Sequence, residues 1–302
     1  MRQSLPRGVH GALIALITLL TTALAAGCSL AGDDPGRTEA GTAGRQGTVK
    51  RPAPAWDTRP ASLAALGDSI TRGFDACGIL TDCPDVSWAT GSRRSVESIA
   101  TRVLDRPAAH SWNLASSGAR MRDLPAQAQK AVDLRPEQVT ILMGANDACT
   151  RSTDLMTPVA EYRKDFSTAL STLTRALPKT QVFVASVPDL MRLWDVGRQN
   201  VLGRQIWKLG LCPSMLSDAQ SMSTAARERR LNVRERVMAY NDALRQECAR
   251  HARCRYDGGM VFDYRFTQKE LSPWDWFHPS AEGQAKLAGL VYAAAFGPGA
   301  TG

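Results

Sequence analysis

The sequence predicts an α/β protein, a three-layer α/β/α sandwich with a mostly five-stranded parallel sheet. Short apolar runs without alternation recur along the chain, as in strands that are covered on both faces. A helical pattern follows most of these runs, and alternating strands and helices favour parallel strands joined by right-handed crossovers. The 302 residues are enough for one large domain of this kind.

Five segments are expected to form the sheet. Val139–Met143 is the clearest of them, Gln181–Val187 matches it, and Gly259–Phe262 is the weakest. In chain order, the expected strands are Ala61–Leu66, Ser111–Ala115, Val139–Met143, Gln181–Val187 and Gly259–Phe262.

Helical patterns lie between the strands, and prolines such as Pro125 and Pro188 mark their starts and ends. Residues 190–232 are too long for an ordinary connection. We therefore expect a helical insertion there, forming a lid or a wall at the carboxyl edge of the sheet. The expected helices lie near Ser95–Leu104, Leu124–Leu134, Val159–Leu177, Val233–Ala252 and Ser280–Ala295.

Composition and charge exclude several classes of protein. With 44% hydrophobic and 22% charged residues, the chain is not mainly disordered. It has no long apolar run after the N-terminal one, which excludes a multi-span membrane protein. The net charge of +8 is scattered among acidic residues, so we expect a solvated surface and no nucleic-acid partner. A mild basic excess also suits an anionic lipid surface.

Residues 1–27 are expected to be a signal peptide. Arg2 and Arg7 precede the apolar run Ala12–Ala26, which is too short to span a bilayer comfortably. The run ends in Leu-Ala-Ala-Gly-Cys, which resembles a bacterial lipobox in which Cys28 is lipidated after cleavage. Ordinary secretion with cleavage near the end of the run is the alternative.

Residues 28–59 are rich in Gly, Ala, Asp, Arg and Pro, with Trp56 as the only aromatic residue. Such a stretch cannot bury enough surface to fold alone, so we expect a disordered tether. Residues 60–298 are then the folded domain. We predict an exported protein, held at the outer face of the cell membrane as a lipoprotein or secreted.

Six cysteines remain beyond Cys28, and an even number in an exported chain favours disulfides. Two pairs are six residues apart and can close small loops, which leaves the other two cysteines for each other. The expected pairs are Cys77–Cys83, Cys248–Cys254 and Cys149–Cys212. A different partner for Cys149, or a free buried thiol, remains open, and so does a zinc site at Cys248, His251 and Cys254.

The first candidate for chemistry is Gly67-Asp68-Ser69, which follows the first expected strand. A serine at such a turn lies at the carboxyl edge of the sheet, where open α/β folds bind ligands. The following helix N-terminus supplies free N–H groups that suit an oxyanion. Taken alone, the motif also fits a simple turn in which Ser69 caps a helix.

Three further blocks follow the same logic. Asn113–Gly118 follows the second expected strand, Gly144–Asp147 follows the third, and Asp275–Ser280 precedes the last helix. These points share one edge of a parallel sheet. A nucleophile, a glycine turn, an amide side chain and an Asp/His pair at one crevice are the groups that acyl transfer needs.

The four blocks, in this order, resemble those of the SGNH (GDSL) hydrolase superfamily over residues 61–296. Ser87–Gly91, Asp123–Ala128 and Asn146–Cys149 resemble its phospholipase B-like subgroup and the actinobacterial secreted lipases and esterases related to it. The resemblance implies a flavodoxin-like fold.

Carried over by position, the resemblance assigns a role to each of five residues. Ser69 is the nucleophile, His278 is the general base and then the acid, and Asp275 orients His278. The N–H groups of Ser69 and Gly118 and the side chain of Asn146 form the oxyanion hole. A Cys149–Cys212 bridge would anchor the loop that presents Asn146, so its loss should reduce stability and activity together.

The resemblance implies a monomeric serine esterase that acts on lipid acyl esters, without a metal or organic cofactor. The Trp and Met residues of 190–232, with Trp274, Trp276 and Phe277, would supply apolar walls for an acyl chain, although at least half of the aromatic residues should be core. The alternatives are a carbohydrate O-acetyl esterase and a catalytically silent lipoprotein that binds lipid or glycan.

Overall fold

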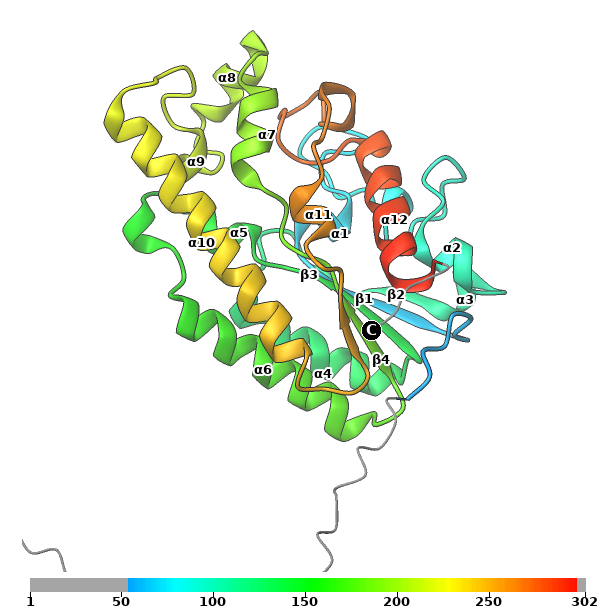
Figure 1. The fold of residues 1–302 in the computed structure, drawn as a ribbon. Coiled ribbons are helices and arrows are strands. Elements are labelled where there is room, and N and C mark those ends of the chain that lie inside the picture. Colours follow the sequence, from blue (N-terminus) through cyan, green and yellow to red (C-terminus); the bar gives the residue numbers. More distant parts are fainter. Residues whose placement is uncertain (1–53, 298–302) are drawn as a thin grey trace, which may run out of the picture. The chain divides into compact units, whose positions relative to one another are not determined.

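A computed structural model describes residues 54–297. Its five strands form one parallel sheet in the order β2-β1-β3-β4-β5, with helices on both faces (Figure 1). The predicted three-layer α/β/α fold class is therefore confirmed. The strands are β1 Leu63–Gly67, β2 Ser111–Asn113, β3 Gln138–Leu142, β4 Gln181–Val184 and β5 Cys254–Tyr256.

The three central strands, β1, β3 and β4, are buried along their whole length. Both faces of these strands are covered, which is why their sequences are nearly continuous apolar runs. In the register, Gly67 lies opposite Leu142, and Ile141 lies opposite Val184. The three strands therefore end level with one another, and the loops that follow them meet at one edge.

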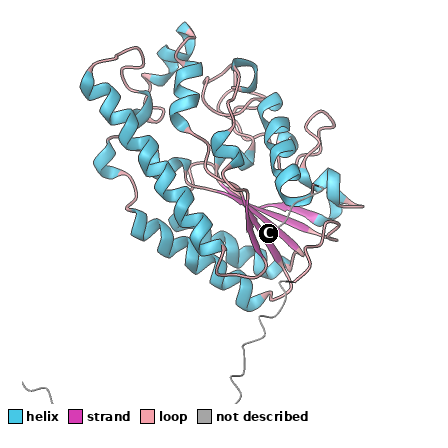
Figure 2. Cartoon of the chain, viewed as in Figure 1, coloured by secondary structure: helices cyan, strands magenta, loops and turns pink. Residues whose placement is uncertain are grey.

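The helices form the two outer layers of the sandwich (Figure 2). On one face, α4 (Leu124–Leu134), α6 (Val159–Ala176) and α10 (Thr224–Cys248) pack side by side (Figure 1). On the other face, α12 (Ala281–Phe296) contacts α2 (Ile99–Val103) and α11 (Met260–Asp263). The remaining short elements are α1 Ser69–Arg72, η1 Pro84–Val86, α3 Pro107–His110, η2 Met121–Asp123, α5 Ala145–Ala148, η3 Thr153–Leu155 and η4 Gln268–Glu270.

The expected insertion at 190–232 is helical. It contains α7 (Leu190–Gly197), α8 (Val201–Trp207) and α9 (Pro213–Leu216), and its last residues begin α10. Figure 1 shows α7 and α8 beyond the carboxyl ends of the strands, above α5.

The fifth expected strand was wrong. Gly258 and Gly259 have left-handed φ angles of 70° and 90°, and the chain then turns into α11. The carboxylate of Asp257 accepts the N–H groups of Gly259 and Val261, which fixes this turn. The edge strand is instead Cys254–Tyr256, which has a charged residue at its centre and no apolar run to reveal it.

Among the other elements, three differ from the expected bounds by three residues or more. The helix expected from Val233 begins nine residues earlier, at Thr224, where Ser223 Oγ caps the N–H of Ala226. This early part is rich in arginine but not all exposed: Arg230 is buried with its guanidinium over the Trp194 ring. The helix near Ser95–Leu104 shortens to Ile99–Val103, and the strand from Gln181 ends at Val184.

The six described cysteines form the three expected disulfides, Cys77–Cys83, Cys149–Cys212 and Cys248–Cys254. The last of these rules out the zinc alternative, because both of its thiols are consumed. The expected signal peptide 1–27, Cys28 and the expected tether up to residue 53 lie outside the described residues. Among the helices of residues 54–297, none is both long and apolar enough to cross a membrane.

Candidate active site

Ser69 lies at the sharp turn between β1 and α1, where three local features fix it. Gly67 must lack a side chain, because a Cβ there would come within 2.5 Å of the Leu142 carbonyl oxygen. The Gln127 side chain pairs with both the N–H and the C=O of Gly67, at 2.8 and 2.9 Å. Asp68 then caps the helix by accepting the N–H of Ile70 at 2.9 Å. Ser69 is thus presented at the first position of α1.

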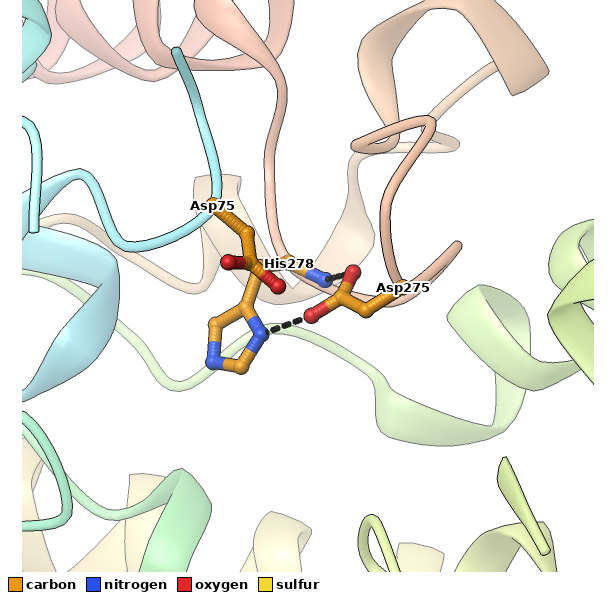
Figure 3. A group of neighbouring side chains, drawn as sticks. All are labelled: Asp75, Asp275 and His278. Carbon is orange, nitrogen blue, oxygen red and sulfur yellow. Dashed lines mark hydrogen bonds and ion pairs between the residues drawn. The ribbon is translucent and has the colours of Figure 1, made fainter. Parts of the chain in front are cut away.

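Ser69, His278 and Asp275 form a hydrogen-bonded line. Ser69 Oγ is 3.0 Å from His278 Nε2. Figure 3 shows the next contact of the line, in which His278 Nδ1 bonds to the carboxylate of Asp275. The second carboxylate oxygen of Asp275 accepts the backbone N–H groups of Phe277 and His278, each at 2.9 Å. The fold therefore brings Ser69 to the Asp275/His278 pair, although Ser69 and His278 are 209 positions apart in the sequence.

The electrostatics suit a charged Asp275 beside a basic His278. Burial opposes the ionisation of Asp275, but the charge and hydrogen bonds of His278 lower its pKa overall. Burial likewise opposes the charged form of His278, yet the negative charge of Asp275, with smaller contributions from Asp68 and Asp75, raises its pKa. The imidazole is thus a stronger base than a free histidine.

The expected oxyanion donors come from three loops at the same edge. Gly118 has a left-handed φ of 80° in the loop after β2, and Asn146 lies on α5, directly after β3. Asn146 Nδ2 donates to the Ala119 carbonyl at 3.0 Å, which ties these two loops together. A carboxamide has a second N–H, so one donor remains. Within residues 54–297, neither the Ser69 nor the Gly118 backbone N–H donates to a protein acceptor.

Neighbouring polar residues of the same blocks hold the loops in place. Asn113 Nδ2 donates to the Thr71 carbonyl at 2.9 Å and to Thr90 Oγ1 at 3.1 Å. The Asp147 carboxylate accepts the N–H of Met121 at 2.9 Å, and burial raises the pKa of Asp147 to about 6. These residues face the scaffold of the site and not Ser69.

A cavity of about 240 Å³ opens beside Ser69, Asn146 and His278. Beyond these three residues and the Cys149–Cys212 bridge, its lining is predominantly apolar. The apolar lining residues are Ile70, Ala145, Pro188, Leu190, Leu193, Leu211, Phe266, Phe277, Pro279 and Leu287.

Of the aromatic residues expected as walls, only Phe277 lines this cavity. Trp274 is 41% exposed, and Trp194 and Trp207 are core residues.

Trp207 has a role that the sequence did not indicate, because its indole N–H donates to the Asp275 carbonyl at 2.7 Å. Trp276 packs against Gly203 of α8, where a Cβ would come within 2.7 Å of its ring. The insertion therefore supports the loop that carries Asp275.

Comparisons with known proteins identify the family of this chain. The sequence model of the GDSL-like lipase/acylhydrolase family matches residues 63–291. Human "Phospholipase B1, membrane-associated" is 31% identical over 172 residues, which are 45% of this chain and 12% of that protein. The rat protein of the same name is 26% identical over 212 residues, or 56% of this chain and 14% of its own length. The chain thus spans about an eighth of these relatives.

Solved structures similar to this chain include two bacterial esterases of different substrate class. Phospholipase A1 from Streptomyces albidoflavus is 17% identical, with a TM-score of 0.47 over 78% of this chain and 99% of that one. An acetyl xylan esterase from Geobacillus stearothermophilus is also 17% identical, with a TM-score of 0.45 over 78% of this chain and 92% of that one. Because the family match covers most of the described residues, the chain belongs to the GDSL-like lipase/acylhydrolase family.

Proposed function

We propose that this enzyme hydrolyses lipid acyl esters, with Ser69 as its nucleophile. The observation that carries the proposal is the 3.0 Å contact between Ser69 Oγ and His278 Nε2 at the mouth of an apolar cavity. His278 would take the proton of Ser69 as the hydroxyl attacks the ester carbonyl, and would then give it to the leaving alkoxide. Asp275 would hold the imidazole in the tautomer that accepts this proton and would stabilise the imidazolium.

The tetrahedral intermediate carries a negatively charged oxygen, which needs hydrogen-bond donors around it. The N–H groups of Ser69 and Gly118 and the second N–H of Asn146 are the donors available at this edge. Such donors act mainly on the oxyanion of the transition state, so they lower the barrier more than they tighten substrate binding. Water would then hydrolyse the acyl-enzyme, with His278 as the base.

The cavity supports an acyl chain as the group that is bound. Its 240 Å³ lie below the roughly 300–1,000 Å³ of a drug-sized ligand site, so it suits one acyl chain and not a whole lipid. Leu190, Leu193, Leu211 and Phe266 offer no polar partner for the hydroxyl groups of a sugar. The alcohol part of the ester would therefore remain outside this cavity.

Two assays test the proposal against its alternatives. A fluorophosphonate should label the wild-type enzyme and leave Ser69→Ala unlabelled, whereas a silent binding protein would not react at all. A chain-length series of p-nitrophenyl esters, beside a phospholipid and an acetylated sugar, then identifies the substrate class. Activity confined to acetyl esters would replace the lipid proposal by carbohydrate O-acetyl esterase, and full activity of purified Ser69→Ala would end both.

We also propose that the protein is exported and carried on the membrane by Cys28, as a monomer. Three disulfides support export, because cytosolic thiols are kept reduced. The lipobox-like segment and the polar stretch after it support a lipid anchor on a tether. Mass spectrometry of the mature N-terminus tests this: an unmodified N-terminus near Ala26 would contradict lipidation, and Cys28→Ala should release the enzyme from membranes.

A further inference from the structure

Asp75 is a second buried acid beside the candidate triad, and no motif of the sequence pointed to it. It lies two residues before the Cys77–Cys83 loop, with a left-handed φ of 56° and only 2% of its surface exposed. Its N–H donates to the Thr81 carbonyl at 2.9 Å. Its own carbonyl accepts the hydroxyl of Ser272 at 2.7 Å, which ties it to the loop of Asp275. This backbone geometry holds the side chain against the triad.

The carboxyl group of Asp75 lies directly beside Asp275 and His278 (Figure 3). One oxygen or nitrogen atom from each of the three side chains lies within 4.8 Å of the others. Oδ1 of Asp75 is buried and has no hydrogen-bond partner among residues 54–297. Two ionised carboxylates offer only acceptors to each other, so such a pair becomes stable when it shares one proton.

The charges around this group favour a protonated Asp75. Burial first, then the negative charge of Asp275, raise the pKa of Asp75 to about 6, while the charge of His278 opposes this. From α1, Asp68 adds negative charge toward His278. Arg72, the last residue of α1, is paired with Asp82 at 3.0 Å.

We propose that Asp75 is a positioning residue that shares a proton with Asp275 and, when it loses that proton, strengthens His278 as a base. The inference rests on the proposed function of His278. In the protonated form, the O–H of Asp75 donates to the Asp275 carboxylate and steadies it. When the proton leaves for solvent, two carboxylates face the imidazole and favour the imidazolium that forms during attack by Ser69.

A bound cation is the other way to join two carboxylates and an imidazole. It would have to displace hydrogen bonds that both ring nitrogens of His278 already make, Nδ1 to Asp275 and Nε2 to Ser69. A proton needs no such rearrangement, which is why the geometry favours it.

The test is the pH profile of Asp75→Asn. Asparagine keeps the shape, tolerates the left-handed φ and can donate to Asp275, but it cannot ionise. Loss of the charge lowers the basicity of His278. The acid limb of kcat/KM should therefore move to lower pH by about one unit, and the plateau should fall by about tenfold or less. Asp85→Asn is the matched control, since Asp85 is exposed and paired with Arg93 at 2.8 Å. This control should leave the acid limb of kcat/KM at the same pH as in the wild type.

A measurement that does not depend on turnover distinguishes a failure of this inference from a failure of the proposed function. In wild-type enzyme with labelled histidine, the NMR shift of the His278 ring should titrate in two steps, because ionisation of Asp75 perturbs it. A single step, or an unmoved acid limb in folded Asp75→Asn, would overturn the proposal. All pH profiles are measured with and without EDTA. If EDTA shifts the acid limb of kcat/KM in the wild type, a bound cation is present and the proposal is overturned as well.

Discussion

Removal of the Cys149–Cys212 bridge is the perturbation for which the structure gives the sharpest expectation. Cys149 ends α5, the helix that carries Asn146, and Cys212 precedes α9 in the insertion. Both cysteines also line the cavity beside Ser69. The variant Cys149→Ala/Cys212→Ala therefore tests how the oxyanion donor and the cavity wall are held.

The expected loss of stability follows from the length of chain that the bridge closes. A separation of 63 residues corresponds to about 4 kcal/mol in the loop-closure model, as an upper figure. The matched control is Cys248→Ala/Cys254→Ala, whose six-residue separation gives about 2 kcal/mol at the opposite edge of the sheet. Urea unfolding followed by circular dichroism measures both values.

The effect on activity is a separate question, because three hydrogen bonds join the same two segments. Ser214 N–H donates to the Thr150 carbonyl at 2.8 Å, and its hydroxyl donates to the Ala148 carbonyl at 2.7 Å. Thr150 N–H donates to the Ser214 hydroxyl at 3.2 Å. These bonds change the sequence-based expectation that stability and activity are lost together. They should keep Asn146 in place, so at a temperature where the variant is folded we expect kcat within about tenfold of wild type.

Two results would contradict this reasoning. A stability loss no larger than that of the Cys248/Cys254 control would refute the loop-closure argument. A loss of about a hundredfold in kcat, the size expected for a shift of roughly 1 Å, would show that the bridge alone positions Asn146. Adding Ser214→Ala to the bridge-free variant should produce that hundredfold loss, because it also removes the hydroxyl bonds.

Three further outcomes follow from the site. Asn146→Ala should lower kcat by about 10²–10³ with little change in KM, and a raised KM at constant kcat would make Asn146 a substrate-binding residue instead. Because Asp275 raises the pKa of His278, kcat/KM should fall as the pH drops below that raised value and should recover above it; a profile flat down to pH 4 would exclude His278 as the base. Trp207→Phe removes the bond to the Asp275 carbonyl, so kcat should fall by about tenfold or less with KM unchanged, whereas wild-type kcat would show that this bond does not position Asp275.

Much of the fold could be predicted because its buried strands are recognisable in the sequence as apolar runs. The runs at Val139–Met143 and Gln181–Val187 are apolar since helices cover both faces of β3 and β4. The edge strand Cys254–Tyr256 has no such cover and no such run, so the apolar Met260–Phe262 beyond two glycines was mistaken for it. Local sequence could not show that Asp257 turns this segment into a helix.

The candidate site shows the same division between local and long-range information. Ser69, Asn146 and His278 were predictable because each sits at a motif whose spacing to a strand or helix end is fixed. Asp75 and Trp207 were not, because their contacts with the triad depend on loops whose paths no motif specifies. Burial of Asp75 and the indole bond of Trp207 become visible only when residues from distant parts of the chain are placed together.

If the proposed function holds, the insertion links substrate binding to catalysis more directly than a variable loop on a rigid scaffold would. Leu193 and Leu211 line the cavity, while Trp207, between them in sequence, bonds to the Asp275 carbonyl. Gly203 of the same segment lies against the Trp276 ring. A change in the insertion that alters acyl-chain preference must therefore leave these two contacts intact, or the orientation of His278 changes with it. Exchange of the whole insertion should consequently change acyl-chain selectivity and kcat together. Substitution of a single cavity residue should change selectivity without changing kcat.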